Sequence, residues 1–166
     1  MNLNIFSRHA ERVRHANIAQ MVNVLQAMIL TDGPKMVLTP TYYVFRMYVP
    51  FQDATILPVT YEAGHYAVGE FDLPRVDAIA ARTREGKIAL SVTNIDAQHP
   101  ATVNITLHDL KGARVQGETL SAPKVDGINT FDSPKNVVPQ AIAAGIKNGR
   151  LTLTLPPASV TVVTTQ

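Results

Sequence analysis

The sequence predicts a mainly β protein whose larger part is an antiparallel β-sandwich. Residues 54–166 contain no methionine and are rich in Val, Ile and Thr, which suit the pleated, half-buried surface of a strand. Apolar and polar side chains alternate in residues 103–107 and 151–155, so one face of each strand is expected to be buried and the other solvated. Turn-forming dipeptides recur between these runs, as a sandwich of many short strands requires.

Eight strands and four turns are expected in this part of the chain. The strands are expected over residues 54–60, 76–82, 88–95, 102–107, 115–120, 142–146, 151–155 and 159–164. The turns are expected at Glu85-Gly86, Lys111-Gly112, Asn148-Gly149 and Pro156-Pro157. A change in composition near residue 53 divides the chain into residues 1–52 and residues 53–166.

The first part of the chain mixes helical and strand-like patterns. Apolar residues at helical spacing predict a first helix, whose buried face is formed by Leu3, Phe6, Ala10 and Val13. Residues 18–29 also fit a helix, whereas residues 13–19 equally fit a buried strand. Periodicity alone leaves both alternatives open.

Clearer local signals follow in residues 28–48. Asp32-Gly33 lies between two apolar runs and predicts a tight hairpin, because glycine tolerates the positive φ that the turn needs. Thr39-Pro40 predicts the start of a helix, with threonine as the N-cap and proline at the first helical position. The buried face of this short helix is expected to hold Val44, Met47 and Tyr48.

The composition limits the function classes. At 166 residues the chain has the length of one ordinary domain, and its net charge of +2 is too small to indicate a nucleic-acid or anionic-membrane surface. The absence of cysteine excludes disulfides, thiolate nucleophiles and Cys-ligated metal sites. No signal-peptide pattern and no run of about 18 apolar residues is present. We therefore expect a cytoplasmic globular chain without a nucleic-acid or membrane partner.

The familiar catalytic motifs are missing from the sequence. It contains no glycine-rich phosphate loop, no zinc-protease helix motif, no nucleophile elbow and no EF-hand loop. The five histidines show no metal-ligand spacing, so no metal site is expected. Most of the thirteen carboxylates are expected in turns or on solvated strand faces. Glu70 and Asp72, for example, predict a solvated loop.

Aromatic residues cluster where a sugar could stack. The cluster comprises Tyr42, Tyr43, Phe45, Tyr48 and Phe51, while tryptophan, the usual stacking platform, is absent. A buried helix face accounts for Tyr48, and Tyr42 and Tyr43 remain open to either interpretation. A free-standing carbohydrate-binding or purely structural β-sandwich is therefore an alternative function.

Four stretches together resemble the C-terminal part of glycoside hydrolase family 51 α-L-arabinofuranosidases. RVRHANIAQMVNVLQ at residues 12–26 resembles the last barrel strand and the following turn, and LTPTYYVFRMY at residues 38–48 resembles the final barrel helix. NTFDSPKNVVP at residues 129–139 resembles a loop of the family's β-domain, and LPPASV at residues 155–160 resembles its closing strand.

The resemblance implies a particular architecture and a missing catalytic pair. It implies that residues 1–52 are the remnant of a (β/α)8 barrel, its final helix-strand-helix portion, and that residues 53–166 are a jelly-roll-like β-sandwich. Family members hydrolyse terminal α-L-arabinofuranosyl groups of arabinan and arabinoxylan with retention, without a cofactor, and are commonly homo-oligomers. The first of their two catalytic glutamates follows an asparagine, and the second lies close to a tryptophan. The chain has no Asn-Glu dipeptide and no tryptophan, so it is expected to lack both glutamates and to be inactive alone.

One functional position carries over by resemblance. The family's glutamine in an Ala-Gln-x-Val-Asn stretch reaches the subsite that holds the arabinofuranose ring, and it corresponds to Gln20. The carboxyl end of a barrel strand faces the active site, and an amide can both donate to and accept from sugar hydroxyls. Asn17 and Asn23 are expected to bond loop backbone rather than substrate.

Overall fold

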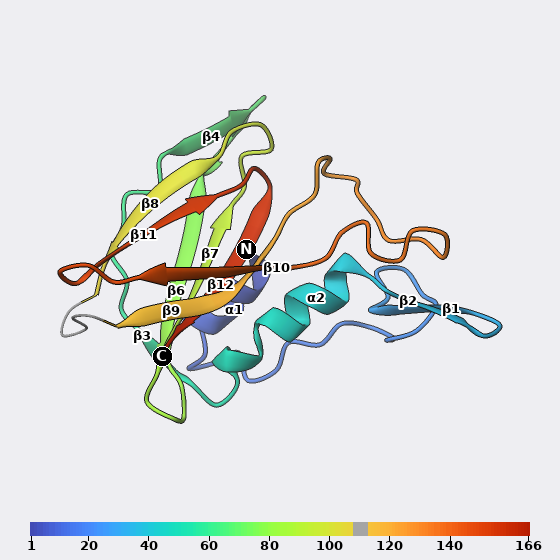
Figure 1. Ribbon diagram of the computed structural model, residues 1–166, viewed down its shortest axis with the longest axis horizontal. Helices are drawn as coiled ribbons and strands as arrows, with labels where there is room; N and C mark the ends of the chain where they lie inside the picture. The colour runs from blue at the N-terminus through green and yellow to red at the C-terminus, as the bar shows by residue number, and fades with distance from the viewer. Residues whose placement is uncertain (108–112) are drawn as a thin grey trace.

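The computed structural model describes residues 1–107 and 113–166, which form three layers. A six-stranded antiparallel sheet lies in the middle, two helices cover one of its faces, and a two-stranded sheet covers part of the other (Figure 1). The elements in chain order are α1 (Asn2–Arg8), β1 (Ile29–Asp32), β2 (Lys35–Leu38), α2 (Pro40–Met47), the 3-10 turn η1 (Val49–Phe51), β3 (Thr55–Leu57), β4 (His65–Val68), β5 (Phe71–Pro74), β6 (Val76–Arg82), β7 (Ile88–Asn94), β8 (Ala101–Thr106), β9 (Arg114–Leu120), β10 (Gln140–Gly145), β11 (Arg150–Leu155) and β12 (Ser159–Thr165).

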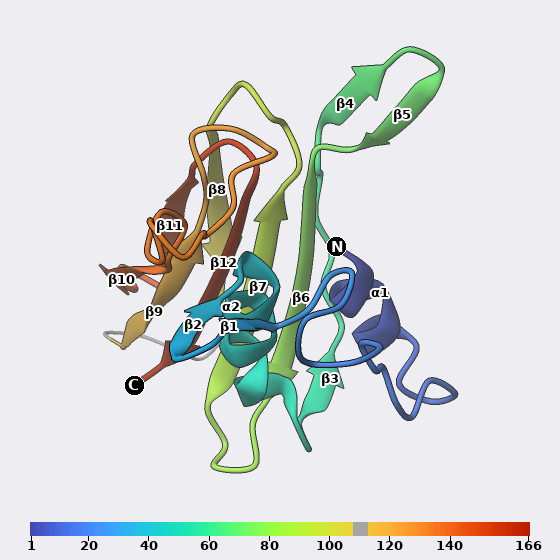
Figure 2. The same cartoon turned by 90° about the vertical axis from the view of Figure 1, so that its right-hand side faces the viewer.

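The six-stranded sheet has the order β10-β9-β12-β7-β6-β3, with every neighbouring pair antiparallel. The last strand, β12, therefore lies at the centre, between β9 and β7. Three further antiparallel pairs complete the β-structure of the described residues, namely β11-β8 and the hairpins β1-β2 and β4-β5. The β4-β5 hairpin projects away from the layers, on the same side as α1 (Figure 2).

Two separate cores lie on the two faces of the six-stranded sheet. The first joins β6 and β7 to β8 and β11, and Leu151, Leu153 and Leu155 are buried in it. The second joins Ile79 and Val162 to α2 residues such as Met47. Both faces of the middle layer are covered, so every residue of β7 is buried. The expected alternation of buried and solvated faces is confirmed in β11, and in β8 half-buried residues alternate with exposed ones in the same way.

The local signals around residues 28–48 are confirmed. β1 and β2 pair with Asp32 opposite Lys35, so Gly33-Pro34 forms a two-residue turn, and Gly33 has φ +53°. Thr39 caps α2, because its Oγ1 accepts a hydrogen bond from the Tyr42 N–H at 3.4 Å. Tyr48 closes the helix at its other end and is buried.

Seven of the eight expected strands form within one or two residues of the expected limits, and β3 is shorter than expected at three residues. The solvated loop expected at Glu70 and Asp72 is confirmed for Glu70, which lies in the exposed two-residue turn Gly69-Glu70 of the β4-β5 hairpin, and wrong for Asp72, which is exposed but lies in β5. Gly69 has φ +60°, the positive φ that this two-residue turn requires. The expected turn at Lys111-Gly112 lies outside the described residues.

Neither alternative for the segment after the first helix is correct. The first helix ends at Arg8 instead of reaching Val13, and residues 9–28 contain no helix or strand beyond a single parallel bridge between Val22 and Ile29. Asn23 and Gln26 have positive φ, which interrupts a helix. A strand needs hydrogen-bonding neighbours, and the described part of the chain supplies none to residues 13–19.

Candidate functional site

Gln20 lies on the surface, in the irregular segment between α1 and β1. The residue after it is well anchored, because the Met21 carbonyl accepts hydrogen bonds from the N–H groups of Met28 and Ile29, both at 3.0 Å. The Gln20 side chain itself is exposed, so its amide is free to bind a ligand that approaches this face.

Asn23 fixes the loop that follows Gln20. Its Oδ1 accepts from the Thr31 N–H at 2.8 Å, and its Nδ2 donates to Thr31 Oγ1 at 2.9 Å. These two bonds hold the loop against β1 and support the positive φ of Asn23. The predicted bond of Asn23 to nearby backbone is confirmed by the Thr31 N–H, and its role toward substrate stays a prediction.

Apolar side chains are unusually exposed on the segment that carries Gln20. Leu25 is 91 % exposed, and Met21 and Val22 are also exposed. Phe6 of α1 and Met36 of β2 are further exposed apolar residues in the first part of the chain. A concentration of exposed apolar residues is typical of a surface that another part of a protein covers.

A buried polar network attaches α1 to the six-stranded sheet. Asp77 of β6 is 2 % exposed, and it accepts from Asn4 Nδ2 at 2.8 Å and from Arg8 Nη1 at 2.7 Å. Tyr48 Oη donates to Asn4 Oδ1 at 2.6 Å and lies 2.7 Å from Ser91 Oγ. Burial raises the pKa of Tyr48, so this hydroxyl stays protonated and able to donate. The network fixes the position of the helix that precedes the Gln20 segment.

Asn4 and Asp77 were not predicted from the sequence. Most carboxylates were expected in turns or on solvated faces, whereas Asp77 and Asp96 are buried. A signal was present in residues 76–81, where Asp77 is the single charged residue of an otherwise apolar strand. A carboxylate in such a position is expected to be buried with partners. The partners come from residues 4, 8 and 61, because the Tyr61 hydroxyl also donates to Asp77 Oδ1 at 3.3 Å, and no local pattern identifies them.

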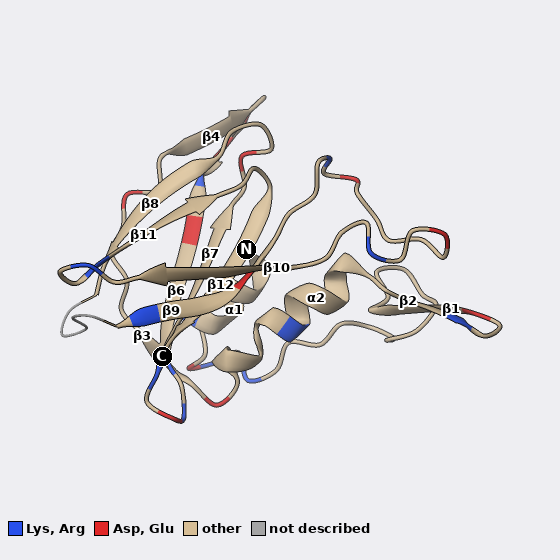
Figure 3. Cartoon of the chain, viewed as in Figure 1, with Lys and Arg blue, Asp and Glu red and all other residues tan. Residues whose placement is uncertain are grey.

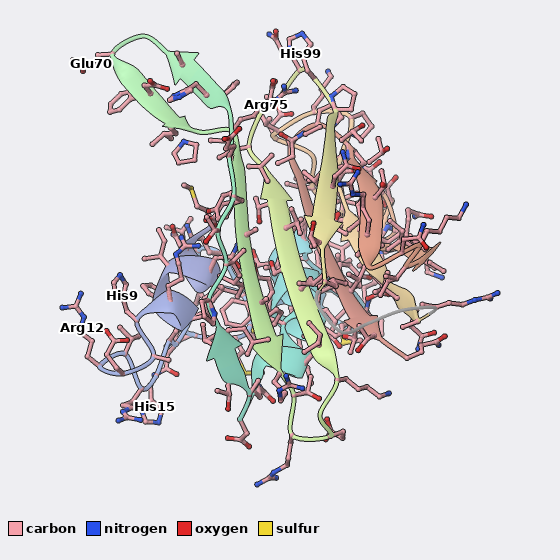
Figure 4. The ribbon with its side chains drawn as sticks, turned by 90° about the vertical axis from the view of Figure 1, so that its left-hand side faces the viewer. His9, Arg12, His15, Glu70, Arg75 and His99 are labelled. Atoms are coloured by element: carbon pink, nitrogen blue, oxygen red, sulfur yellow. The ribbon has the colours of Figure 1, made fainter. Side chains whose placement is uncertain are left out.

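A shallow crevice of about 280 Å³ separates α1 from α2. It is lined by apolar residues of both helices, including Leu3, Phe6 and Phe45, and by Val13 and His15 of the following segment. Figure 4 shows His9, Arg12 and His15 projecting outward near the end of α1. Among the described residues, no three His, Asp or Glu side chains come together as a metal site.

The tyrosines of α2 are largely used within the fold. Tyr43 packs against the second core, and its ring contacts Tyr42 edge to face with 5.5 Å between centroids. The Arg46 guanidinium lies 5.6 Å from the centre of the Tyr43 ring and also forms an ion pair with Glu118 of β9 at 2.6 Å. Tyr43 is therefore a poor candidate for a sugar-stacking platform.

A second buried carboxylate, Asp96, organises the loop between β7 and β8. Its Oδ1 accepts from the N–H groups of Gln98 and His99 at 2.9 and 3.0 Å. Arg75 Nε and His99 Nδ1 each lie 3.2 Å from its Oδ2. Figure 4 shows Arg75 and His99 together at this end of the sandwich. The hydrogen bond from the Gln98 N–H contributes most to lowering the pKa of Asp96 below its ordinary value of 3.8. The contacts from His99 lower it further.

This lowered pKa predicts an acid-sensitive contribution to stability. A carboxyl group whose pKa is lower in the folded state stabilises that state above its unfolded pKa, and the contribution disappears as the pH falls toward the folded pKa. We expect the free energy of unfolding to fall more steeply below about pH 4 in the native chain than in Asp96→Asn. Urea unfolding from pH 2.5 to pH 6 measures the difference. If the free energy of unfolding depended on pH equally in the native chain and in Asp96→Asn, the lowered pKa of Asp96 would be contradicted.

Charged residues of both signs are interspersed, mainly in loops and at strand ends (Figure 3). None of the helices in the described ranges is long and apolar enough to span a membrane.

The chain is similar to known proteins along nearly its whole length. The family model described as the alpha-L-arabinofuranosidase C-terminal domain matches residues 1–159. An intracellular exo-alpha-L-arabinofuranosidase of Bacteroides ovatus is 40 % identical over 162 residues, which are 96 % of this chain and 32 % of the relative. An exo-alpha-(1->6)-L-arabinofuranosidase of Bifidobacterium longum is 26 % identical over 94 % of this chain and 31 % of the relative.

Solved structures agree with these matches. The GH51 arabinofuranosidase of Xanthomonas axonopodis pv. citri superposes with a TM-score of 0.94 at 46 % identity, over 99 % of this chain and 34 % of that protein. The alpha-L-arabinofuranosidase of Thermotoga maritima in its arabinose complex superposes with a TM-score of 0.82 at 25 % identity, over 98 % of this chain and 36 % of that protein. The chain therefore spans about a third of the length of the relatives it matches.

Proposed function

The chain belongs to the α-L-arabinofuranosidase C-terminal domain family, and we propose that it works as the C-terminal domain of a longer glycoside hydrolase of family 51. The proposed activity is the hydrolysis of terminal α-L-arabinofuranosyl groups of arabinan or arabinoxylan, with retention. The observation that carries the proposal is the superposition on a GH51 arabinofuranosidase over 99 % of this chain.

We propose that residues 1–52 complete the barrel and residues 53–166 form the sandwich attached to it. The exposed apolar residues Met21, Val22 and Leu25 support this division, because a neighbouring barrel strand would cover them. The network of Asn4, Arg8 and Asp77 supports a fixed junction between the two parts.

In this arrangement Gln20 contacts the arabinofuranose ring. Its exposed side chain and the anchored backbone after it support this role, since a positioned amide can bond two sugar hydroxyls. Tyr43 is packed within the fold, so a stacking-based carbohydrate-binding module is less well supported than this subsite.

Hydrolysis of an aryl α-L-arabinofuranoside tests the proposal. The 166-residue chain is expected to release no phenol above the buffer blank, because both catalytic glutamates are expected upstream, whereas the longer polypeptide is expected to turn over. In the longer polypeptide, Gln20→Ala is expected to lower kcat/KM by about tenfold, the equivalent of one hydrogen bond of about 1.4 kcal/mol.

Asn17→Ala is the matched control, because Asn17 is exposed in the same segment. It is expected to leave kcat/KM unchanged. Turnover by the purified 166-residue chain, lost on replacing one of its own carboxylates, would overturn the proposed function. An unaltered kcat/KM in Gln20→Ala would show that Gln20 does not contribute to the subsite.

We also propose an intracellular homo-oligomer as the form of the longer protein. The Bacteroides ovatus relative is named intracellular, which supports the location. The projecting hairpin carries the exposed apolar side chains Val68 and Phe71, which support a protein contact there.

A further inference from the structure

The residues that follow Gln20 are hydrogen-bonded to the outer edge of β1. The Ile29 N–H donates to the Met21 carbonyl at 3.0 Å, and the Ile29 carbonyl accepts from the Asn23 N–H at 3.1 Å. Both backbone groups of Ile29 therefore point away from β2. Because residues 21–23 are bonded to β1 in this way, the position of Gln20 follows that of the β1-β2 hairpin.

The outer edge of β2 is bonded by a residue of the sandwich. Leu38 lies opposite Ile29 in the hairpin, and residues opposite each other in an antiparallel pair have the same bonding state. The Leu38 carbonyl therefore also points away from its partner strand. It accepts a hydrogen bond from Asn129 Nδ2 at 2.8 Å. The hairpin is thus held between residues 21–23 on one side and Asn129 on the other.

Asn129 lies in loop 121–139, which connects β9 to β10 and extends past α2 toward the hairpin (Figure 1). It is 2 % exposed, and its Nδ2 also donates to the Val137 carbonyl at 2.9 Å, while its Oδ1 accepts from the Val137 N–H at 2.6 Å. Val137 is itself buried in the second core. Among the hydrogen bonds of the described residues, only the one from Asn129 to Leu38 joins this loop to residues 1–52.

We propose that Asn129 is a positioning residue for Gln20, because it fixes the hairpin, and with it the residues that follow Gln20, relative to the sandwich. This inference rests on the proposed function, in which Gln20 contacts the arabinofuranose ring. Asn129 does not bind the sugar itself, since both of its amide protons bond carbonyl groups at a buried position. A displacement of about 1 Å that originates far from the reacting atoms can cost about 100-fold in rate. The sandwich thereby helps to build the sugar subsite from a distance.

A double-mutant cycle in the longer polypeptide tests the positioning role. Asn129→Ala is expected to lower kcat/KM for the aryl arabinofuranoside by about fivefold, less than Gln20→Ala, because the subsite amide is loosened rather than removed. In the Gln20→Ala background, the same change is expected to lower kcat/KM by less than about 1.5-fold. A residue that only stabilises the fold would give the same loss in both backgrounds. Equal losses in the two backgrounds, or no loss in either, overturn the proposal.

Asn136→Ala is the matched control. Asn136 lies in the same loop, and its Nδ2 donates to the Ile128 carbonyl at 3.0 Å, a bond within the loop. Its replacement is expected to leave kcat/KM unchanged in both backgrounds. A loss as large as that of Asn129→Ala would show that general loosening of the loop is the cause, and would overturn the role of the bond to Leu38.

Asn129→Asp takes the place of the alanine variant if that variant does not fold. The aspartate has nearly the same volume and keeps an acceptor for the Val137 N–H, but it cannot donate to the Leu38 carbonyl as a carboxylate. The same losses of kcat/KM are expected, and the same outcomes overturn the proposal.

Backbone order parameters, measured by NMR in the 166-residue chain, give a readout that needs no catalysis. The amides of Met21 and Asn23 are expected to have order parameters of about 0.85 in the native chain and below about 0.7 in Asn129→Ala. Val162, in the central strand β12, is expected to keep a value of about 0.85 in both proteins. Order parameters report on the folded state, so a loss of stability alone does not lower them. Unchanged values at Met21 and Asn23 would overturn the proposal.

The kinetic and NMR readouts separate this inference from the proposed function. An active longer polypeptide whose kcat/KM falls in Gln20→Ala but not in Asn129→Ala would overturn the positioning role alone. An inactive longer polypeptide, combined with lowered order parameters in Asn129→Ala, would overturn the proposed function and leave standing the fixing of residues 21–23 by Asn129.

Discussion

Replacing Asp77 with alanine is expected to lower the free energy of unfolding by about 3 kcal/mol. The carboxylate is buried and accepts hydrogen bonds from Asn4 and Arg8, at 2.8 and 2.7 Å. Its removal leaves the buried Asn4 amide without its acceptor and the Arg8 guanidinium without its counter-charge. Arg8 is partly exposed and can reach water, which keeps the cost below that of a fully buried pair. Urea denaturation of the 166-residue chain measures the change.

Two further variants separate this network from a general effect of losing a carboxylate. Asp72→Ala removes an exposed aspartate of the β4-β5 hairpin that pairs with His65, and it is expected to cost less than about 0.5 kcal/mol. Asp77→Asn keeps one acceptor oxygen and loses the ion pair, so an intermediate loss is expected. If Asp77→Ala were as stable as Asp72→Ala, the network would not hold α1 on the sheet.

Replacing Leu153 with alanine is expected to cost a similar amount, about 3 kcal/mol. Leu153 is 2 % exposed and lies in the first core, where β11 packs on the six-stranded sheet. Truncation loses the transfer free energy of the buried side chain and leaves a cavity that the rigid β-layers fill only in part. Thermal and urea unfolding of the variant measure the loss.

Thr154→Ala is the matched control for Leu153→Ala. Thr154 is the next residue of β11 and is exposed on the opposite face of the strand. We expect its replacement to change stability by less than about 0.5 kcal/mol. Similar losses in the two variants would mean that β11 does not bury one face against the sheet.

The sandwich could be predicted from the sequence because its signals are local. The alternation in residues 151–155 fixes which side chains of β11 face the core, and Thr39-Pro40 fixes where α2 begins. The two covered faces of β7 could not be predicted from its own pattern. One face is covered by α1 and α2, which lie about 40 or more residues away in the sequence, and the other by β8 and β11.

The candidate site was harder to predict, since its contacts join distant parts of the chain. Gln20 was predicted from a family resemblance, and the helical and strand patterns around it were misleading, because residues 9–28 form neither element apart from the Val22 bridge. Asn4 and Asp77 are 73 residues apart, so their contact leaves no spacing signal. The β4-β5 hairpin was missed for another reason, because the charges of Glu70 and Asp72 outweighed the turn signal of Gly69.

The central place of β12 has a consequence for synthesis of the protein. Strands β7, β6 and β3 form one half of the six-stranded sheet and β9 and β10 form the other, and among the described strands only β12 joins the two halves by hydrogen bonds. About 70 residues separate the end of β7 from the end of β12, which at about 5–20 residues per second is roughly 4–14 s of translation. Throughout that interval the half-sheet of β7, β6 and β3 has an open edge, and once β10 has followed β9 a second half-sheet adds another, so chaperone protection matters most just before the last strand leaves the ribosome.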